Sequence, residues 1–240
     1  MIYFQSNAEI GDLSEWVADG GGGVYTADGV DPSSLSTLEV QASTEQAHAG
    51  THSIRCYLAN PATVNNAKLM RWWDGARKHF PKTAYYEAWY NFDPGYFTVT
   101  WDNIMQWKTV TDKEPTFVVR ALTINGVRQM SLSHWPVGQG FLPPQPGQPV
   151  DGKYYQANPI SLLSSTWVKL RVYYKLSRTQ GVFILWQDGA QLFKLEKINT
   201  QDSIQKSPPN TAVMFGVGAY MSPTERPGQL LYVDDIKVEV

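Results

Sequence analysis

Alternation of hydrophobic and polar residues predicts β-strands along most of this chain. Short runs rich in Val, Ile, Thr, Tyr, Trp and Phe lie between turn residues, and few windows repeat apolar residues at helical spacing. Many strands with almost no helix predict an all-β fold in which two antiparallel sheets pack as a sandwich, and so many strands favour a jelly roll. The predicted strands are Leu38–Ser43, Ser53–Leu58, Ala84–Phe92, Asn103–Val110, Phe117–Ile124, Arg128–Trp135, Trp167–Leu176, Gly181–Gln187, Gln191–Lys197, Val213–Ala219 and Leu230–Val240.

Turn chemistry supports this pattern at two places. Asn125-Gly126 and Asp188-Gly189 each lie between two predicted strands, and such pairs adopt the positive φ angles of a two-residue hairpin at low cost. Two longer segments, Gly20–Ser36 and Val137–Asn158, are irregular and rich in turn residues. Loops of that length inside a domain tend to be functional or mobile.

Composition narrows the class of protein. The chain has 240 residues, of which 42% are hydrophobic, which is enough for one sizeable core. The formal net charge of −2 argues against a dedicated nucleic-acid binder. No apolar run approaches the roughly 18 residues of a membrane-spanning helix, so we expect no membrane insertion. The single cysteine, Cys56, excludes an internal disulfide framework and is expected to be a small buried side chain.

The first eight residues are set apart from the fold prediction. Residues 1–8 resemble the recognition site of a tag-removal protease followed by a vector scar. We therefore predict one domain over residues 9–240 and expect it to be monomeric. A tagged chain often starts after a removed signal peptide, so the missing signal is uninformative; we expect the natural protein to be secreted or attached to the cell surface.

Several segments resemble secreted carbohydrate-binding domains and polysaccharide lyases. The opening and closing segments resemble those of both groups, two inner strands look like paired strands of concanavalin A-like jelly rolls, and two more look like central strands of heparin-lyase-like and alginate-lyase-like enzymes. The resemblance implies a concanavalin A-like jelly roll that binds or cleaves a polysaccharide. In chain order the segments are Glu9–Trp16, Ala49–Arg55, Tyr86–Tyr90, Asn103–Lys108, Trp167–Val172, Val182–Gly189 and Leu231–Val238.

The match to the lyase pattern is incomplete. Alginate lyases of this fold carry Q-I/V-H on a central strand, and a Y-x-x-G-x-Y-x-Q strand supplies their catalytic tyrosine. Here Gln106-Trp107-Lys108 has lysine in place of histidine, so only Gln106 transfers directly. The tyrosine-bearing segment Val172–Lys175 lacks the glycine and the distal tyrosine of the second pattern.

Strand alternation predicts a basic and aromatic groove if the polar faces lie on one concave sheet. Aromatic rings stack on sugars, and cations favour a glycan that carries uronate groups. The alternative is an ordinary polar outer face whose long side chains cover apolar surface. The predicted glycan-binding residues are Glu87, Trp89, Gln106, Lys108, Arg120, Lys169, Arg171 and Trp186.

Some of these residues, together with Tyr173 and His134, suggest a route to β-elimination. This reaction needs a cation to neutralise the uronate carboxylate and a base to take the C5 proton. Arg120 or Arg171 could neutralise, and Lys108, Tyr173 or His134 could act as the base. Hydrolysis is disfavoured because no E-x-D-x-E run supplies a pair of carboxylates on one strand face.

The resemblance also implies a structural calcium ion. In the resembling carbohydrate-binding domains, calcium ties the first strand to the last through a carboxylate from each, and Glu9 and Asp235 match those positions. The alternative is that both are solvated charges. His48 and His52 have the spacing of zinc ligands but lie beside Gly50 in a strand region, so zinc is not expected.

The sequence is compatible with three functions. The main prediction is recognition of an acidic polysaccharide, because catalysis needs a base that the family pattern does not supply in its usual form. The alternative is a polysaccharide lyase, and the second alternative is a structural or adhesive surface domain that contacts no glycan. The decisive geometric question is whether the predicted groove residues converge.

Overall fold

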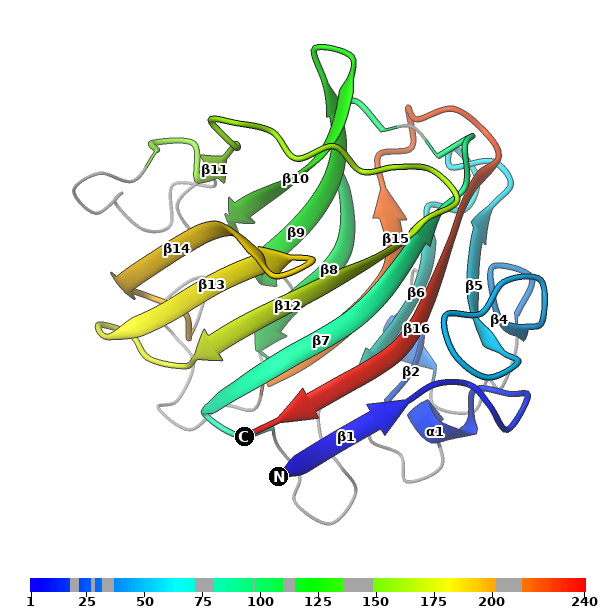
Figure 1. Cartoon of the computed structure of the whole chain (residues 1–240), viewed down its shortest axis with the longest axis horizontal. Coiled ribbons are helices and arrows are strands. Elements are labelled where there is room, and N and C mark those ends of the chain that lie inside the picture. The colour runs from blue at the N-terminus through cyan, green and yellow to red at the C-terminus, as the bar shows by residue number, and fades with distance from the viewer. Residues whose placement is uncertain are drawn as a thin grey trace.

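The chain forms a sandwich of two eight-stranded sheets, called here sheet A and sheet B (Figure 1). The computed structural model describes residues 1–17, 22–26, 29–31, 37–71, 80–96, 98–109, 115–135, 149–201 and 213–240. All strand pairings within the sheets are antiparallel, so the predicted all-β antiparallel sandwich is confirmed.

Sheet A lies in front in Figure 1, and both chain termini lie at its lower edge. β1 (Ile2–Ser6) pairs with β16 beside the main path of the sheet. The order along that path is β14 (Ala190–Ile198), β13 (Gly181–Gln187), β12 (Trp167–Lys175), β7 (Thr83–Phe92), β16 (Gln229–Glu239), β5 (Ser53–Leu58) and β4 (Val40–Ser43).

Sheet B lies behind sheet A and carries most of the strands that the chain contributes in its middle third. A short helix, α1 (Ser14–Val17), lies beside its β2 end. The strand order is β11 (Lys153–Tyr154), β10 (Val127–His134), β9 (Pro115–Ile124), β8 (Asp102–Thr109), β15 (Val213–Met221), β6 (Asn66–Arg71), β2 (Gly22–Thr26) and β3 (Gly29–Asp31).

Aromatic side chains from both sheets fill the space between them. Trp107 of sheet B stacks on Tyr174 of sheet A with ring centroids 5.6 Å apart, and Phe117 stacks on Phe183 at 4.6 Å. All four rings are at most 2% exposed. Cys56 is buried in the same core, as predicted, and burial raises the pKa of its thiol to about 12.

Both predicted hairpin turns are present. Asn125 and Gly126 have φ angles of 50° and 80°, and Asp188 and Gly189 have φ angles of 49° and 84°. Positive φ at both central positions is the type I′ geometry that matches the twist of the flanking strands.

The N-terminal segment belongs to the fold, so excluding residues 1–8 from the fold prediction was wrong. β5 pairs with β16 as far as Val233, and β1 takes over that edge from Ile236 onward. Phe4 of β1 is 7% exposed and packs against Trp16, with ring centroids 5.1 Å apart. β1 pairs here because it satisfies the backbone groups of β16 that β5 leaves open and because the pairing buries the Phe4 ring. The resemblance of residues 1–8 to a vector scar stays a prediction about where these residues come from.

The predicted strands omitted five that the structure contains: β1, β2, β3, β6 and β11. β2 and β3 form a hairpin inside the segment that was predicted to be irregular. Val110 and most of the two irregular segments lie outside the described residues. Among the described residues, no helix is long and apolar enough to span a membrane.

Candidate active site

A cluster of polar side chains lies on the outer face of sheet B. Trp107 points into the core, so its neighbours Gln106 and Lys108 point the opposite way. Lys68 and Arg120 are each flanked by core residues in the same manner. Tyr220 joins them, because its ring lies 5.4 Å from the Lys68 ammonium nitrogen. We call these five residues, Lys68, Gln106, Lys108, Arg120 and Tyr220, the B-face cluster.

Strand register brings the cluster together. β15 lies between β6 and β8, with Gly218 opposite Lys68 and Gly216 opposite Gln106. On the far side of β8, Gln106 is opposite Val118 of β9, two residues before Arg120. The cluster therefore draws on four adjacent strands of one sheet.

Hydrogen bonds fix the centre of the cluster. Lys68 Nζ donates to Gln106 Oε1 at 2.9 Å, and Gln106 Nε2 lies 3.2 Å from Met70 Sδ. Lys68 is fully buried and Gln106 is 3% exposed. A buried amide with both ends held has a fixed orientation, which suits a group that must bind a substrate oxygen.

Burial shifts the pKa values of two cluster residues and of Asp102, which interacts with both. It lowers the pKa of the Lys68 amine well below its usual value; Asp102 opposes this shift, and the charge of Lys108 reinforces it. Burial also lowers the pKa of Arg120 and raises that of Asp102 to about 7, although hydrogen bonds from Tyr96 and the Ala121 amide favour the ionised carboxylate. Lys68 is thus set up to lose its proton more readily than a surface lysine, as a base must.

Tyr220 is the cluster residue that is most open to solvent. It is half-buried, whereas Gln106, Lys108 and Arg120 are at most 8% exposed. Its ring packs edge-on against Trp101, with centroids 5.0 Å apart. A phenol held in this way beside an amine can exchange a proton with a bound sugar.

Sequence reasoning missed Lys68 and Tyr220. The strand carrying Lys68 was not predicted, and the catalytic tyrosine pattern was sought only around Val172–Lys175. The usable signal was Gly218-Ala219-Tyr220, which supplies the G-x-Y of that pattern, with Phe215 and Ser222 in place of its first tyrosine and its glutamine.

The prediction of a single groove is wrong, because the predicted residues divide between the two sheets. Gln106, Lys108 and Arg120 lie on the outer face of sheet B. The remaining predicted groove residues, and Tyr173, lie on the outer face of sheet A, across the core. They are Glu87 and Trp89 on β7, Lys169 and Arg171 on β12, and Trp186 on β13.

His134 lies in neither place. It is opposite Phe117 in the β9–β10 pairing, and the two rings stack with centroids 4.4 Å apart on the core side of sheet B. Burial lowers the pKa of its imidazole to about 4. The structure therefore separates His134 from Lys108, and of the three predicted bases only Lys108 belongs to the cluster.

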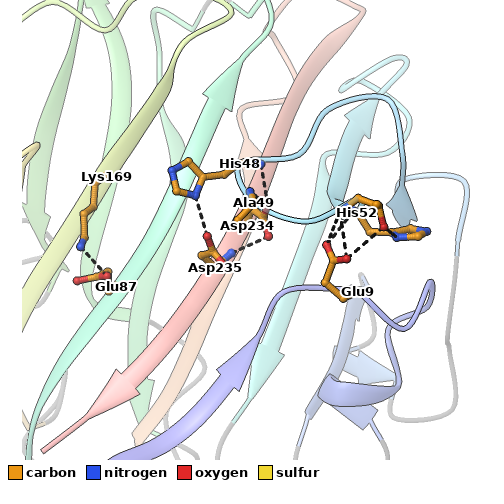
Figure 2. A network of polar contacts seen from close by, with 9 residues as sticks. Glu9, His48, Ala49, His52, Glu87, Lys169, Asp234 and Asp235 are labelled. Atoms are coloured by element: carbon orange, nitrogen blue, oxygen red, sulfur yellow. Dashed lines mark hydrogen bonds and ion pairs between the residues drawn. The ribbon is translucent and has the colours of Figure 1, made fainter.

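The two predicted calcium ligands are held in separate hydrogen-bonded groups (Figure 2). Glu9 accepts hydrogen bonds from the backbone amides of Thr51 and His52, both at 2.9 Å. Asp235 lies 2.7 Å from His48 Nδ1. Within the described residues no group of three or more His, Cys, Asp or Glu side chains is arranged to hold a metal ion. A shared calcium ion would have to replace these contacts, so calcium stays a prediction.

Comparison with known proteins identifies the family. A family model described as polysaccharide lyase matches residues 8–237. The chain belongs to the polysaccharide lyase family. No curated protein sequence matches this family member significantly.

Solved structures similar to this polysaccharide lyase family member share its fold at low sequence identity. A double mutant of the alginate lyase Aly36B in complex with alginate trisaccharide gives a TM-score of 0.64 at 10% identity, covering 99% of this chain and 98% of that one. The alginate lyase vAL-1 from Chlorella virus gives 0.58 at 12% identity, covering 83% and 89%. The cellulose-induced protein Cip1 gives 0.54 at 10% identity, covering 90% and 95%. The predicted concanavalin A-like architecture is thereby confirmed.

Proposed function

We propose that this protein cleaves a uronate-containing polysaccharide by β-elimination and that the B-face cluster is its active site. The observation that carries the proposal is the convergence of two lysines, an arginine, a fixed amide and a tyrosine on one face of one sheet, in a member of the polysaccharide lyase family. The alginate trisaccharide bound to the similar lyase Aly36B supports a uronate substrate.

The reaction has three requirements. The C6 carboxylate must be neutralised so that charge can develop at C5, the C5 proton must be removed, and the glycosidic oxygen at C4 must receive a proton as its bond to C4 breaks. A double bond between C4 and C5 remains in the product. Neither water nor a covalent intermediate takes part.

Arg120 and Gln106 are suited to the carboxylate. An arginine can donate two parallel hydrogen bonds to a carboxylate, and the fixed amide of Gln106 can donate a further one. In the low-dielectric surroundings of the cluster, these donors stabilise the developing enolate charge more strongly than they would in water.

Tyr220 and the two lysines are suited to the proton transfers. We assign removal of the C5 proton to Tyr220, because it combines contact with Lys68 and access to solvent. Lys68, whose neutral form burial favours, accepts the phenol proton of Tyr220. The Tyr220 phenolate then takes the C5 proton and donates it to the glycosidic oxygen as the C4–O bond breaks, so the cluster gains and loses no net proton. Lys108 supplies positive charge beside it, in the position where the related pattern has histidine.

The test is cleavage of acidic glycans, followed by the ultraviolet absorbance of the unsaturated product. We expect absorbance to rise with at least one of alginate, glucuronan and a heparin-type glycan. Tyr220→Phe is expected to lower the rate by about 100-fold or more, as for loss of a general acid–base group. Tyr57→Phe, on sheet A, is the matched control and should leave the rate unchanged.

The other two functions predict different results from the same experiment. Binding without any rise in absorbance would favour glycan recognition alone, and neither binding nor cleavage would favour a structural or adhesive domain. Secretion or attachment to the cell surface, and a monomeric state, fit a polymer-cleaving enzyme and stay predictions.

A further inference from the structure

A hollow lies on the outer face of sheet A, on the opposite side of the sandwich from the B-face cluster. It has a volume of about 340 Å³ and is lined by Tyr85, Lys169, Arg171, Trp186 and Gly189. These residues come from three adjacent strands and the β13–β14 turn. The volume is within the range of small-ligand sites, and the hollow contains none of the residues assigned to β-elimination.

Aromatic rings form much of this hollow and its border. Tyr85 and Tyr173 are cross-strand partners with ring centroids 5.0 Å apart, and Trp186 is the cross-strand partner of Arg171. All three rings are half-buried, so part of each remains available to a ligand. Rings held by their neighbours on a sheet can stack on the C–H faces of sugar rings with little loss of side-chain entropy.

Each cation in the hollow is already matched by a carboxylate. Lys169 Nζ lies 2.7 Å from Glu87 Oε1, and Arg171 contacts Glu87 at 3.8 Å and Glu239 at 3.2 Å. The Arg171 guanidinium also lies 4.4 Å from the centre of the Tyr85 ring. An anionic ligand would have to compete with these carboxylates, whereas sugar hydroxyls can both donate to Glu87 and accept from Lys169 and Arg171.

One wall of the hollow is preformed. The backbone amide of Asp188 donates to the Lys169 carbonyl at 2.9 Å, and the Lys169 amide donates to Asp188 Oδ1 at 2.8 Å. These bonds fasten the β13–β14 turn, with Gly189 at its tip, to β12. A rigid wall reduces the ordering cost of binding.

From these observations we propose that the hollow is a second, non-catalytic glycan-binding site that takes a neutral pyranose chain. Trp186 and Tyr85 stack on sugar rings, and the Lys169–Glu87–Arg171 group binds the hydroxyls. The site holds the enzyme on a neutral polysaccharide while the opposite face is free to act on a uronate chain. It differs from the B-face cluster in its ligand, because its charges are paired.

Affinity electrophoresis tests this proposal without relying on catalysis. The full chain carrying Tyr220→Phe is run in native gels that contain hydroxyethyl cellulose, glucomannan, neutral arabinoxylan or alginate. We expect at least one of the three neutral glycans to retard the protein, with little dependence on salt. Adding Trp186→Ala or Tyr85→Ala is expected to weaken that retardation about tenfold, as expected for loss of a stacking ring.

Tyr57→Ala is the matched control. Tyr57 is also half-buried on the outer face of sheet A, and the Arg55 guanidinium lies 4.6 Å from its ring centre, so the pair mimics Arg171 and Tyr85. Thermal unfolding of each variant separates loss of binding from loss of fold. The proposal is overturned by retardation in alginate alone, by none in any gel, or by equal weakening from Tyr57→Ala and Trp186→Ala. None of these results depends on whether the protein is a lyase.

Discussion

Lys68 and Gln106 are joined by a 2.9 Å hydrogen bond across a strand that separates them. Their strands, β6 and β8, both pair with β15, and the residues of β15 opposite them are Gly218 and Gly216. At these two positions the outer face of β15 carries no side chain, so a long lysine and an amide can meet above it. This hydrogen bond links Lys68, which contacts Tyr220, to the β8 side of the B-face cluster.

Replacing Lys68 should separate activity from stability. We expect Lys68→Met to lower the rate of uronate elimination by about 100-fold, because the neutral amine is lost from the cluster. The melting temperature should change little. Two effects on stability oppose each other. Removing a buried amine stabilises the folded state, whereas the loss of the donor to Gln106 Oε1 costs about 1–3 kcal/mol of folding free energy.

The measurement is initial rate and thermal unfolding on the same preparations, with Lys194→Met as the control. Lys194 is exposed and lies 3.1 Å from Glu196, so its loss should affect neither quantity much. In the parent protein the rate should fall on acidification, as Lys68 becomes protonated. A Lys68→Met variant with parental activity would remove Lys68 from the mechanism.

Gly216 should be required for the shape of the cluster. A Cβ atom at this position would lie 2.1 Å from Met70 Sδ and 3.0 Å from the Leu69 carbonyl oxygen. We therefore expect Gly216→Ala to displace Met70 and, through it, the amide of Gln106, lowering both activity and the melting temperature. Adding Met70→Ala should restore part of the activity by making room for the new methyl group.

Gly126→Ala provides the contrast for that experiment. Nothing lies within 4 Å of a Cβ at Gly126, but its φ angle is 80°. This substitution should reduce stability by about 1 kcal/mol through backbone strain and leave activity unchanged. Equal loss of activity in both glycine variants would mean that Gly216 has no special role.

The strand pattern predicted the sandwich well but not the position of the site. Alternation assigns each side chain to a face of its own strand, and it correctly placed Gln106 beside Lys108 and Lys169 beside Arg171. It does not reveal which strands share a sheet. Residues of similar chemistry on two sheets therefore looked like one groove.

Lys68 was missed for a different physical reason. Its strand reads Asn-Ala-Lys-Leu-Met-Arg, which has few β-branched or aromatic residues, and strand formation there depends on pairing with β15 and β2. A lysine in such a run would ordinarily be expected in solvent. Its burial is set by the tertiary structure and carries no local signal.

His134 should make the folded state sensitive to acid. Its pKa is about 4 in the folded protein and about 6.5 in an unfolded chain, so the unfolded chain binds more protons between those values. Stability from this group is therefore full above pH 6.5 and is lost as the pH falls towards 4. The expected loss is roughly 3 kcal/mol.

Denaturant unfolding of the parent and of His134→Leu at pH 7 and pH 4 isolates this contribution. Burial raises the pKa of Asp102 to about 7 and that of Asp234 to about 6, and both carboxyls favour folding on acidification. Because both variants contain them, they cancel in the difference between the two proteins. The parent should lose more stability than His134→Leu, and parallel pH curves would show that His134 does not titrate in this range.

Glu9 should fasten the N-terminal segment to the loop before β5 without help from a metal. Its carboxylate accepts the Thr51 and His52 amides, and these hydrogen bonds lower the pKa of Glu9. Gly50 has a φ angle of 71°, and a Cβ there would lie 2.4 Å from the carboxylate, so the turn is closed tightly around it. We expect Glu9→Gln to lower the melting temperature in the presence of EDTA, because a neutral amide accepts these bonds more weakly.

Thermal unfolding with EDTA and with added calcium distinguishes this contact from the calcium site that the resemblance implies. A rise in the melting temperature of the parent on adding calcium, absent from both Glu9→Gln and Asp235→Asn, would support a shared ion. Identical curves in EDTA and calcium, with Glu9→Gln melting below the parent in both, would assign the stabilisation to the hydrogen bonds alone. Equal melting of Glu9→Gln and the parent in EDTA would contradict the fastening role, because the hydrogen bonds to Thr51 and His52 would then contribute nothing measurable to the folded state.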